Sequence, residues 1–306
     1  MDFLSQLKNL SEQVKFDADF GELSEFSNIV ISGMGGSGIA GNIFSELYDK
    51  SPVQVISDYN LPEYAGKRTL FIGISYSGNT EETLSAAREA IKRGCQVRLV
   101  TSGGELSELN EQVVRIPSGL QPRCALGYLL KPFLYSFISK DEQEYNAISR
   151  ILSEMDEKND EERKMAADLF EHKSIPVILG YTPFKWIAYR WKTQFNENSK
   201  VLAFSNYFPE HNHNEIVPLK GTYNKEAFRF ILFGGADSKI EKRIKVTARI
   251  TNTDFIRIPM KGATRLEKLF YLIHYGDYVS YHLASLRGID AEDVSVITEL
   301  KSELKR

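Results

Sequence analysis

The first half of the chain alternates short apolar runs with longer stretches in which apolar residues recur at helical spacing. The runs lie at residues 29–31, 53–56, 70–74, 97–100 and 113–116. They are rich in β-branched residues, and the segments between them are long enough to hold helices, which is typical of buried strands in a parallel sheet. We therefore predict a doubly wound α/β domain over residues 1–145.

The second half repeats this pattern after a charged interval. Residues 141–172 are dense in Glu, Asp and Lys, with apolar residues at helical spacing, and predict helices that join two domains. Apolar runs then return at 175–179, 230–233 and 255–258. A glycine and a helical stretch follow the first of these runs, as they follow the run at 29–31. We predict a second α/β domain over residues 146–306, related to the first by a divergent duplication.

Composition and charge narrow the class of protein. The 306 residues are 42% hydrophobic and 26% charged, which is typical of globular domains. A formal net charge of -3 argues against nucleic acid as a partner. The two cysteines are too few for a disulfide framework, and neither a signal-peptide pattern nor a run of 18 apolar residues occurs. We expect a cytoplasmic protein that binds neither nucleic acid nor membrane.

A glycine-rich loop, GMGGSG at residues 33–38, follows the first predicted strand and opens a helix. Its spacing fits a dinucleotide fingerprint, and Asp58 follows roughly 20 residues later, after the next strand. The physics is less specific, because any glycine-rich helix N-terminus offers free N–H groups and a favourable dipole to an anion. We predict phosphate binding through Gly36 and Ser37, with an NAD-dependent dehydrogenase as an alternative.

A second loop, SYSGNT at residues 75–80, follows the third predicted strand, at the end where open α/β sheets bind ligands. Ser75, Ser77 and Thr80 supply hydroxyl groups, and Gly78 permits tight curvature. Three hydroxyls with nearby N–H groups suit a terminal phosphate better than a pyrophosphate bridge. The alternative is a helix cap formed by Thr80, but a cap explains one hydroxyl and not three.

With these two loops the chain resembles the sugar isomerase (SIS) superfamily, and within it the bifunctional phosphoglucose/phosphomannose isomerases. The motifs are GMGGSGIAG at 33–41, SYSGNTEET at 75–83, PSGLQPR at 117–123, NENSK at 196–200 and HNE at 213–215. The resemblance covers nearly the whole chain, and the ordered set is more specific than any one motif. It implies two flavodoxin-like SIS domains and a reversible isomerisation of glucose 6-phosphate, with mannose 6-phosphate, to fructose 6-phosphate through a cis-enediol(ate).

The resemblance also assigns the chemistry to four residues, with no metal and no other cofactor. Glu197 is implied to shuttle the proton; it lies near the end of a predicted helix, where the macrodipole disfavours its anion and so suits a base. Arg123 is implied to stabilise the enediolate with a guanidinium that stays charged. His213 is implied to help open the sugar ring from across a homodimer interface, and Lys301 to assist ring opening.

Three observations leave alternatives open. The H-x-H pattern at His211 and His213 could form a metal site, as in an unrelated all-β class of phosphoglucose isomerase, but nothing else here predicts a β-barrel. Lys301 shares an apolar stripe with Ile297 and Leu304, so it either extends past the core or points into a site. A sugar-phosphate sensor with the SIS fold would bind phosphate without needing Glu197 or Lys301.

Overall fold

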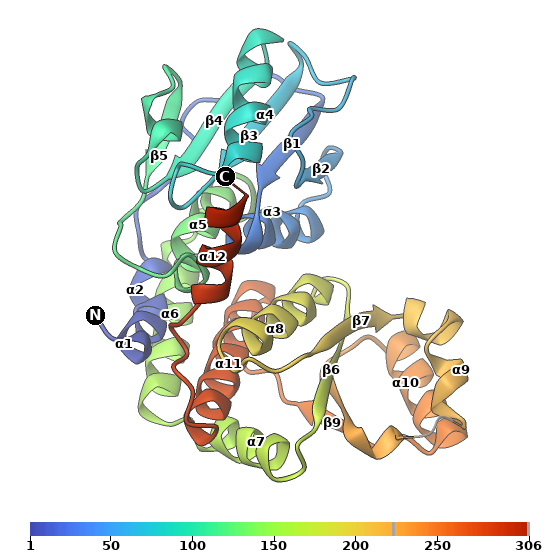
Figure 1. Ribbon diagram of the computed structural model, residues 1–306. Helices are drawn as coiled ribbons and strands as arrows, with labels where there is room; N and C mark the ends of the chain where they lie inside the picture. The colour runs from blue at the N-terminus through green and yellow to red at the C-terminus, as the bar shows by residue number, and fades with distance from the viewer. Residues whose placement is uncertain (222–223, 305–306) are drawn as a thin grey trace. The chain divides into compact units, whose positions relative to one another are not determined.

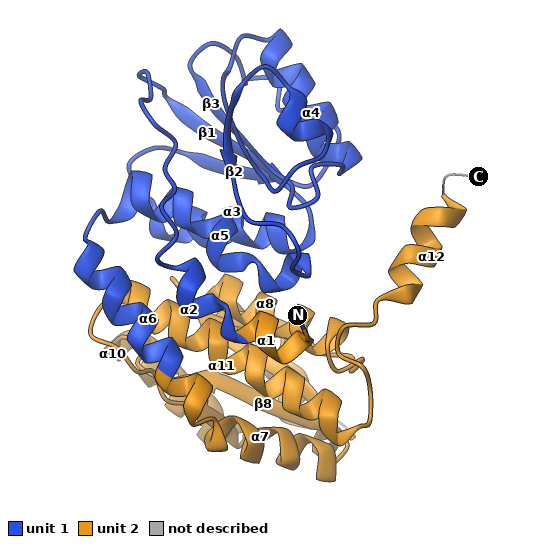
Figure 2. Ribbon diagram, turned by 90° about the vertical axis from the view of Figure 1, so that its left-hand side faces the viewer, with its two compact units in different colours: residues 1, 8–153 blue, residues 2–7, 154–306 orange. Residues whose placement is uncertain are grey.

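The chain folds into two compact units in the computed structural model, which describes residues 1–221 and 224–304 (Figure 1). Unit 1 comprises Met1 and Lys8–Ser153, and unit 2 comprises Asp2–Leu7 and Glu154–Arg306 (Figure 2). The predicted boundary at 145/146 falls inside helix α6, Glu142–Glu157, and the chain passes from unit 1 to unit 2 between residues 153 and 154 of the same helix.

The N-terminal helix α1, Phe3–Lys8, belongs mainly to unit 2, although we predicted that the chain before residue 146 forms one domain. Two contacts explain the difference. The ring of Phe3 stacks on Tyr281 with the centroids 6.2 Å apart, and the Gln6 amide donates a hydrogen bond of 3.1 Å to Glu292. Burial of one apolar and one polar side chain therefore attaches α1 to the second unit.

Unit 1 contains a five-stranded parallel sheet in the order β2-β1-β3-β4-β5. All five predicted apolar runs are strands, and the order is that of a flavodoxin-like sheet. The strands are β1 Asn28–Gly33, β2 Val53–Ile56, β3 Thr69–Ile74, β4 Gln96–Thr101 and β5 Gln112–Arg115. The helices and turns are α2 Leu10–Gln13, α3 Gly35–Leu47, α4 Glu81–Lys92, η1 Glu105–Glu108, η2 Pro122–Cys124, α5 Leu126–Phe133 and η3 Leu134–Ile138.

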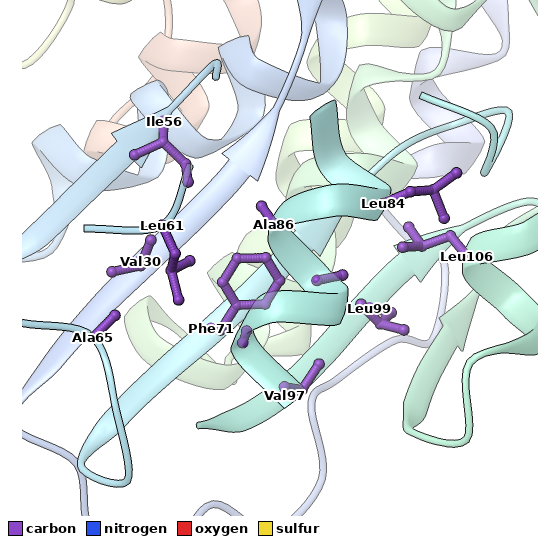
Figure 3. Close-up of a cluster of buried hydrophobic side chains, with 12 residues drawn as sticks. Val30, Ile56, Leu61, Ala65, Phe71, Leu84, Ala86, Val97, Leu99 and Leu106 are labelled. Carbon is purple, nitrogen blue, oxygen red and sulfur yellow. The ribbon is translucent and has the colours of Figure 1, made fainter. Parts of the chain in front are cut away.

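Helices cover both faces of this sheet. Val30 and Phe71 lie in the core cluster that packs under α4 (Figure 3). Ile31 faces the other side, where a Cβ added to Gly41 of α3 would lie 2.8 Å from its Cγ2. Because successive strand residues point to opposite faces, α3 and α4 cover opposite faces of the sheet. The neighbouring strands β1 and β3 therefore form the topological switch point, where open α/β sheets bind their ligands.

Unit 2 contains a four-stranded parallel sheet in the order β7-β6-β8-β9. This is the order of the first four strands of unit 1, as a duplication would produce, and the duplication itself stays a prediction. The strands are β6 Ile175–Tyr181, β7 Phe204–Phe208, β8 Phe228–Phe233 and β9 Phe255–Ile258. The helices and turns are α7 Asp160–Glu171, α8 Lys185–Glu197, η4 Glu210–His213, α9 Ile216–Leu219, η5 Lys225–Ala227, α10 Ser238–Thr251, α11 Arg265–Leu286 and α12 Ser295–Glu303.

Helix α11 forms the centre of unit 2 and is buried along most of its length. The indole of Trp191, on α8, donates a hydrogen bond of 2.8 Å to the Leu272 carbonyl. Gly276 makes this approach possible, because an added Cβ would lie only 2.3 Å from the indole nitrogen. Helix α8 is thus packed directly on α11. In the ranges that the structure describes, no helix is long and apolar enough to cross a membrane.

Candidate active site

The loop of residues 75–80, here called the phosphate loop, is a tight turn held by its own hydroxyl groups. The Ser75 and Thr80 hydroxyls are hydrogen-bonded at 2.8 Å, and Ser75 Oγ also accepts the Gly78 N–H at 3.1 Å. Ser77 Oγ accepts the Asn79 N–H at 3.3 Å and lies exposed at the tip. Unit 1 therefore brings the three predicted hydroxyl residues together in one preformed loop.

Thr80 occupies the N-cap position of α4 but does not cap it. Within the described part of the chain its side chain makes no capping hydrogen bond, because its hydroxyl is directed to Ser75. The alternative that Thr80 is a simple helix cap is therefore excluded. The first N–H groups of a helix have no acceptor inside it, so the N-terminus of α4 offers them, with its positive dipole, to an anion.

Gly78 is required by the shape of the phosphate loop. Its φ is +72°, and an added Cβ would lie 1.7 Å from the Gly103 carbonyl oxygen. That carbonyl is fixed in turn, because it accepts a hydrogen bond of 2.7 Å from the Thr101 hydroxyl at the end of β4. The loop after β3 is thus packed against the loop after β4 without space for a side chain.

The glycine-rich loop starts beside the phosphate loop. Gly33 and Ile74 are register partners at the ends of β1 and β3, so the two loops leave the sheet side by side. A Cβ on Gly38 would lie 2.6 Å from the Gly33 carbonyl oxygen, so Gly38 serves close helix–strand packing. Asp58, the residue of the dinucleotide alternative, is exposed and accepts the Tyr59 N–H at 2.6 Å.

Arg123 belongs to η2, which lies against the first turn of α3. We call the segment of residues 117–124 the Arg123 turn. Arg123 is only 5% exposed, so it is not a surface arginine, and its Nη1 donates to Gln121 Oε1 at 3.3 Å. A Cβ on Gly36 would lie 3.2 Å from the Pro122 carbonyl oxygen and 3.5 Å from Arg123 Cα. The absence of a side chain at Gly36 therefore lets the turn reach α3, where Ser37 is also buried.

Glu197 is the last residue of α8, as predicted, and is half-buried. The residues around it fix the backbone. Asn196 Nδ2 donates to the Val201 carbonyl at 2.8 Å, and Asn198 Nδ2 donates to Ser280 Oγ at 2.9 Å. Lys200 Nζ donates to the Glu197 carbonyl at 2.8 Å. The polar residues of the NENSK motif thus hold the segment that presents the Glu197 carboxylate.

Helix α8 is itself anchored to α11 by a buried charged network. Arg190 Nη2 pairs with Asp277 at 2.9 Å, and both side chains are almost fully buried. Gln194 Nε2 donates to the same carboxylate at 2.7 Å. Breaking a buried pair of this kind is strongly destabilising, because one charge is left without a partner. The network therefore fixes the direction of α8 and the position of Glu197 at its end.

His213 and Glu197 lie at opposite edges of the unit 2 sheet. Helix α8 starts near the carboxyl ends of the parallel strands, where β6 ends, and runs back along the sheet. Glu197, its last residue, is therefore near the amino ends of the strands. His213 follows β7 in η4 and is exposed at the carboxyl edge, and Figure 1 shows β7 pointing towards α9. Unit 2 does not bring these two predicted residues together.

His211, the first histidine of the H-x-H pattern, lies in the core of unit 2. It is fully buried, packs on Phe208 with ring centroids 5.0 Å apart, and its Nδ1 lies 3.0 Å from Glu215 Oε2. This contact lowers the pKa of Glu215. Among the described residues, no group of three or more His, Cys, Asp and Glu side chains could hold a metal ion.

Lys301 is exposed on α12, a helix whose residues, all described, include none that is buried. Ile297 is 42% exposed and Leu304 is 78% exposed. In this chain the apolar stripe is not packed on a core, because helical spacing indicates a face and not what covers it. The role of Lys301 stays a prediction.

The sequence reasoning missed two buried residues, Tyr76 and Gln13, that bind the Arg123 turn through hydrogen bonds. Tyr76 lies inside the SYSGNT motif, but its ring carries none of the features that predict phosphate binding there. Gln13 lies in no motif, so nothing in the sequence indicated it. Unit 2 also contains a hollow of about 1100 Å³ between α7 and the strands β8 and β9, and no predicted site residue lines it.

Comparison with known proteins places the chain in a family. Residues 158–304 match the bacterial phospho-glucose isomerase C-terminal SIS domain. The bifunctional phosphoglucose/phosphomannose isomerase of Thermoplasma acidophilum is 51% identical over 304 residues, covering 99% of this chain and 98% of the relative. The protein of the same name from Thermoplasma volcanium is 52% identical over 99% of this chain and 100% of the relative.

A solved structure agrees on the fold. The tagatose-6-phosphate ketose/aldose isomerase from Escherichia coli superposes with a TM-score of 0.71 at 14% identity, over 94% of this chain and 87% of that one. This likeness concerns the SIS fold alone. Identity above 50% along nearly the full length of two curated relatives shows more: the chain belongs to the family of bifunctional phosphoglucose/phosphomannose isomerases.

Proposed function

We propose that this protein reversibly isomerises glucose 6-phosphate, and mannose 6-phosphate, to fructose 6-phosphate through a cis-enediol(ate), without a metal ion. Membership of the isomerase family over nearly the whole chain carries this proposal. We also propose that the enzyme is cytoplasmic, because its sugar phosphate substrates are intracellular metabolites and its sequence has only two cysteines.

The phosphate of the substrate binds to unit 1. Ser75, Ser77 and Thr80 offer hydroxyls, and the N-termini of α3 and α4 offer N–H groups and positive dipoles. The first turn of α4 also carries Glu81 and Glu82, so the hydroxyls and N–H groups must outweigh the repulsion of these two carboxylates. The buried guanidinium of Arg123 stabilises the developing enediolate.

Glu197 acts as the base. It removes the proton from C2 of the open aldose and returns it to C1, while the proton of the C2 hydroxyl moves to the C1 oxygen, so that C1 carries a hydroxyl and C2 becomes the ketone carbonyl. His213 and Lys301 assist opening of the sugar ring. The position of His213 supports the proposal that a second subunit of a homodimer contributes it, because within unit 2 it lies at the opposite sheet edge from Glu197.

Replacing Glu197 by Gln tests the reaction and the base together. With EDTA present, the wild-type protein should convert fructose 6-phosphate to glucose 6-phosphate, and the Glu197→Gln variant should lose about 10²–10⁴-fold in kcat. The matched control is Glu171→Gln, which changes the last residue of α7 in the same unit and should keep wild-type kinetics. Full activity in Glu197→Gln would refute the mechanism, and phosphate binding without turnover in the wild type would favour a sensor.

A further inference from the structure

Tyr76 belongs to the phosphate loop and connects it to the Arg123 turn. It forms hydrogen bonds through its backbone carbonyl and through its side-chain hydroxyl. Its backbone carbonyl accepts the Ser102 N–H at 3.1 Å and the Ser102 hydroxyl at 2.6 Å. These two bonds fix the backbone of Tyr76 to the segment that follows β4. The direction in which its side chain leaves the phosphate loop is therefore determined by the sheet.

The Tyr76 side chain reaches the first part of the Arg123 turn. Its hydroxyl accepts the Leu120 N–H at 3.0 Å and donates to the Pro117 carbonyl at 3.1 Å. The side chain is only 7% exposed, and burial raises the pKa of Tyr76, so the hydroxyl keeps its proton and can donate throughout the neutral range. One hydroxyl thus closes the turn between residues 117 and 120.

Gln13 holds the other end of the turn. Its Nε2 donates to the Cys124 carbonyl at 2.7 Å, and its Oε1 accepts the Gly127 and Tyr128 N–H groups at 2.9 and 3.3 Å. The side chain is fully buried. Both amide atoms are therefore used to join the residue after Arg123 to the start of α5.

We propose that Tyr76 and Gln13 are positioning residues that fix the buried Arg123 guanidinium relative to the phosphate loop. This inference rests on the proposed function, in which Arg123 stabilises the enediolate. Neither residue needs to touch the substrate. They act by fixing the backbone on each side of Arg123, and a misplacement of about 1 Å can cost up to about 100-fold in rate.

The test is the kinetics of Tyr76→Phe, which removes one hydroxyl and keeps the ring. We expect kcat for fructose 6-phosphate to fall about 10-fold while KM changes less than about 2-fold, because the phosphate loop keeps its own bonds and only the transition state is affected. A planar hydroxamate analogue of the enediolate should bind about 10-fold more weakly, and inorganic phosphate equally well.

The matched control is Tyr145→Phe. Tyr145 is fully buried in unit 1 and donates to the Ser139 carbonyl at 2.8 Å, so the control deletes an equivalent hydroxyl without touching the Arg123 turn. It should lower thermal stability and leave kcat unchanged. Gln13→Met provides a second variant at the other end of the turn, and it should show the same loss of kcat with little change in KM.

The outcomes are distinct. A wild-type kcat in Tyr76→Phe, with a loss of stability like that of Tyr145→Phe, would show a structural role only and overturn the inference. If Tyr76→Phe does not fold, Gln13→Met decides in the same way. A wild-type protein without turnover would refute the proposed function, and the inference with it, whereas an active wild type with unaffected variants would refute the inference alone.

Discussion

Two helices that follow corresponding strands of the two sheets differ in how their N-termini are capped. Helix α4 follows β3 in unit 1, and helix α10 follows β8, the corresponding strand of unit 2. The Asp237 carboxylate caps α10 and accepts the N–H groups of Lys239 and Ile240 at 2.8 and 3.0 Å. In the described chain, Thr80 makes no such bond at α4 and instead binds Ser75.

We infer from this difference that the N-terminus of α10 serves the stability of the fold and that the N-terminus of α4 serves ligand binding. At α10 an anion that belongs to the protein already satisfies the helix terminus, so a phosphate would meet a carboxylate. At α4 the same N–H groups and dipole stay available. The segment between β6 and α8 also lacks the glycines of the loop before α3, and it contains the buried Phe184 where that loop has Ser37. A repeated strand order therefore does not repeat the features that we propose to bind phosphate.

The largest effect is expected for Gly78→Ala, compared with Gly235→Ala in unit 2. Both glycines have positive φ, +72° and +75°. The Gly78 Cβ would collide with a backbone oxygen, whereas the Gly235 Cβ would meet the flexible end of Met260 at 2.7 Å. Gly78→Ala should cost on the order of 2 kcal/mol or more and raise KM at least about 10-fold. If Gly235→Ala weakened substrate binding more than Gly78→Ala does, the result would contradict the comparison.

A smaller effect is expected when the cap of α10 is removed. Asp237→Ala should lower the free energy of unfolding by about 1 kcal/mol, which shifts Tm by roughly 2–4 °C. Because this helix terminus binds no substrate in our account, kcat and KM should stay at their wild-type values. Thermal unfolding and steady-state kinetics on the same preparation check both parts, and a raised KM would count against the account.

The effect that is smallest at neutral pH is a loss of stability in acid, and it again separates the units, because all five histidines lie in unit 2. Burial lowers the pKa of His282 to about 4, and its Nε2 lies 2.8 Å from Asn159 Oδ1. The unfolded chain therefore binds more protons between pH 6.5 and 4, and the stability that His282 contributes above pH 6.5 is lost as the pH falls through that range.

His282→Gln tests this contribution, since glutamine can still donate to Asn159 but does not titrate. Over the same acid range the Tm of this variant should fall several degrees less than the Tm of the wild type. Parallel Tm curves for the two proteins would show that His282 does not cause the acid sensitivity.

Much of the fold could be predicted because buried parallel strands have continuous apolar sequences rich in β-branched residues. Strand β7 was missed, since Ser205 and Asn206 interrupt the apolar pattern of this edge strand. The position of Glu197 at a helix end followed from the strand and helix that precede it. The stripe on α12 shows the limit, because Ile297 and Leu304 keep helical spacing while exposed.

The site was predictable where its residues are close in sequence, as in the phosphate loop. It was not predictable where distant segments meet. The burial of Arg123 depends on the approach of Pro122 to Gly36, and Gln13 lies far from the Cys124 carbonyl in the chain. Such contacts arise from tertiary packing and leave no local pattern in the sequence.

The most direct test of the central claim, that the open N-terminus of α4 binds the substrate phosphate, is to give α4 the cap of α10. Calorimetry should measure inorganic phosphate binding to the wild type, Thr80→Asp and the neutral cap Thr80→Asn. We predict that Thr80→Asp weakens phosphate binding by about 100-fold or more at an unchanged or higher Tm, with Thr80→Asn between the two. Equal phosphate affinity in the wild type and Thr80→Asp would contradict the account.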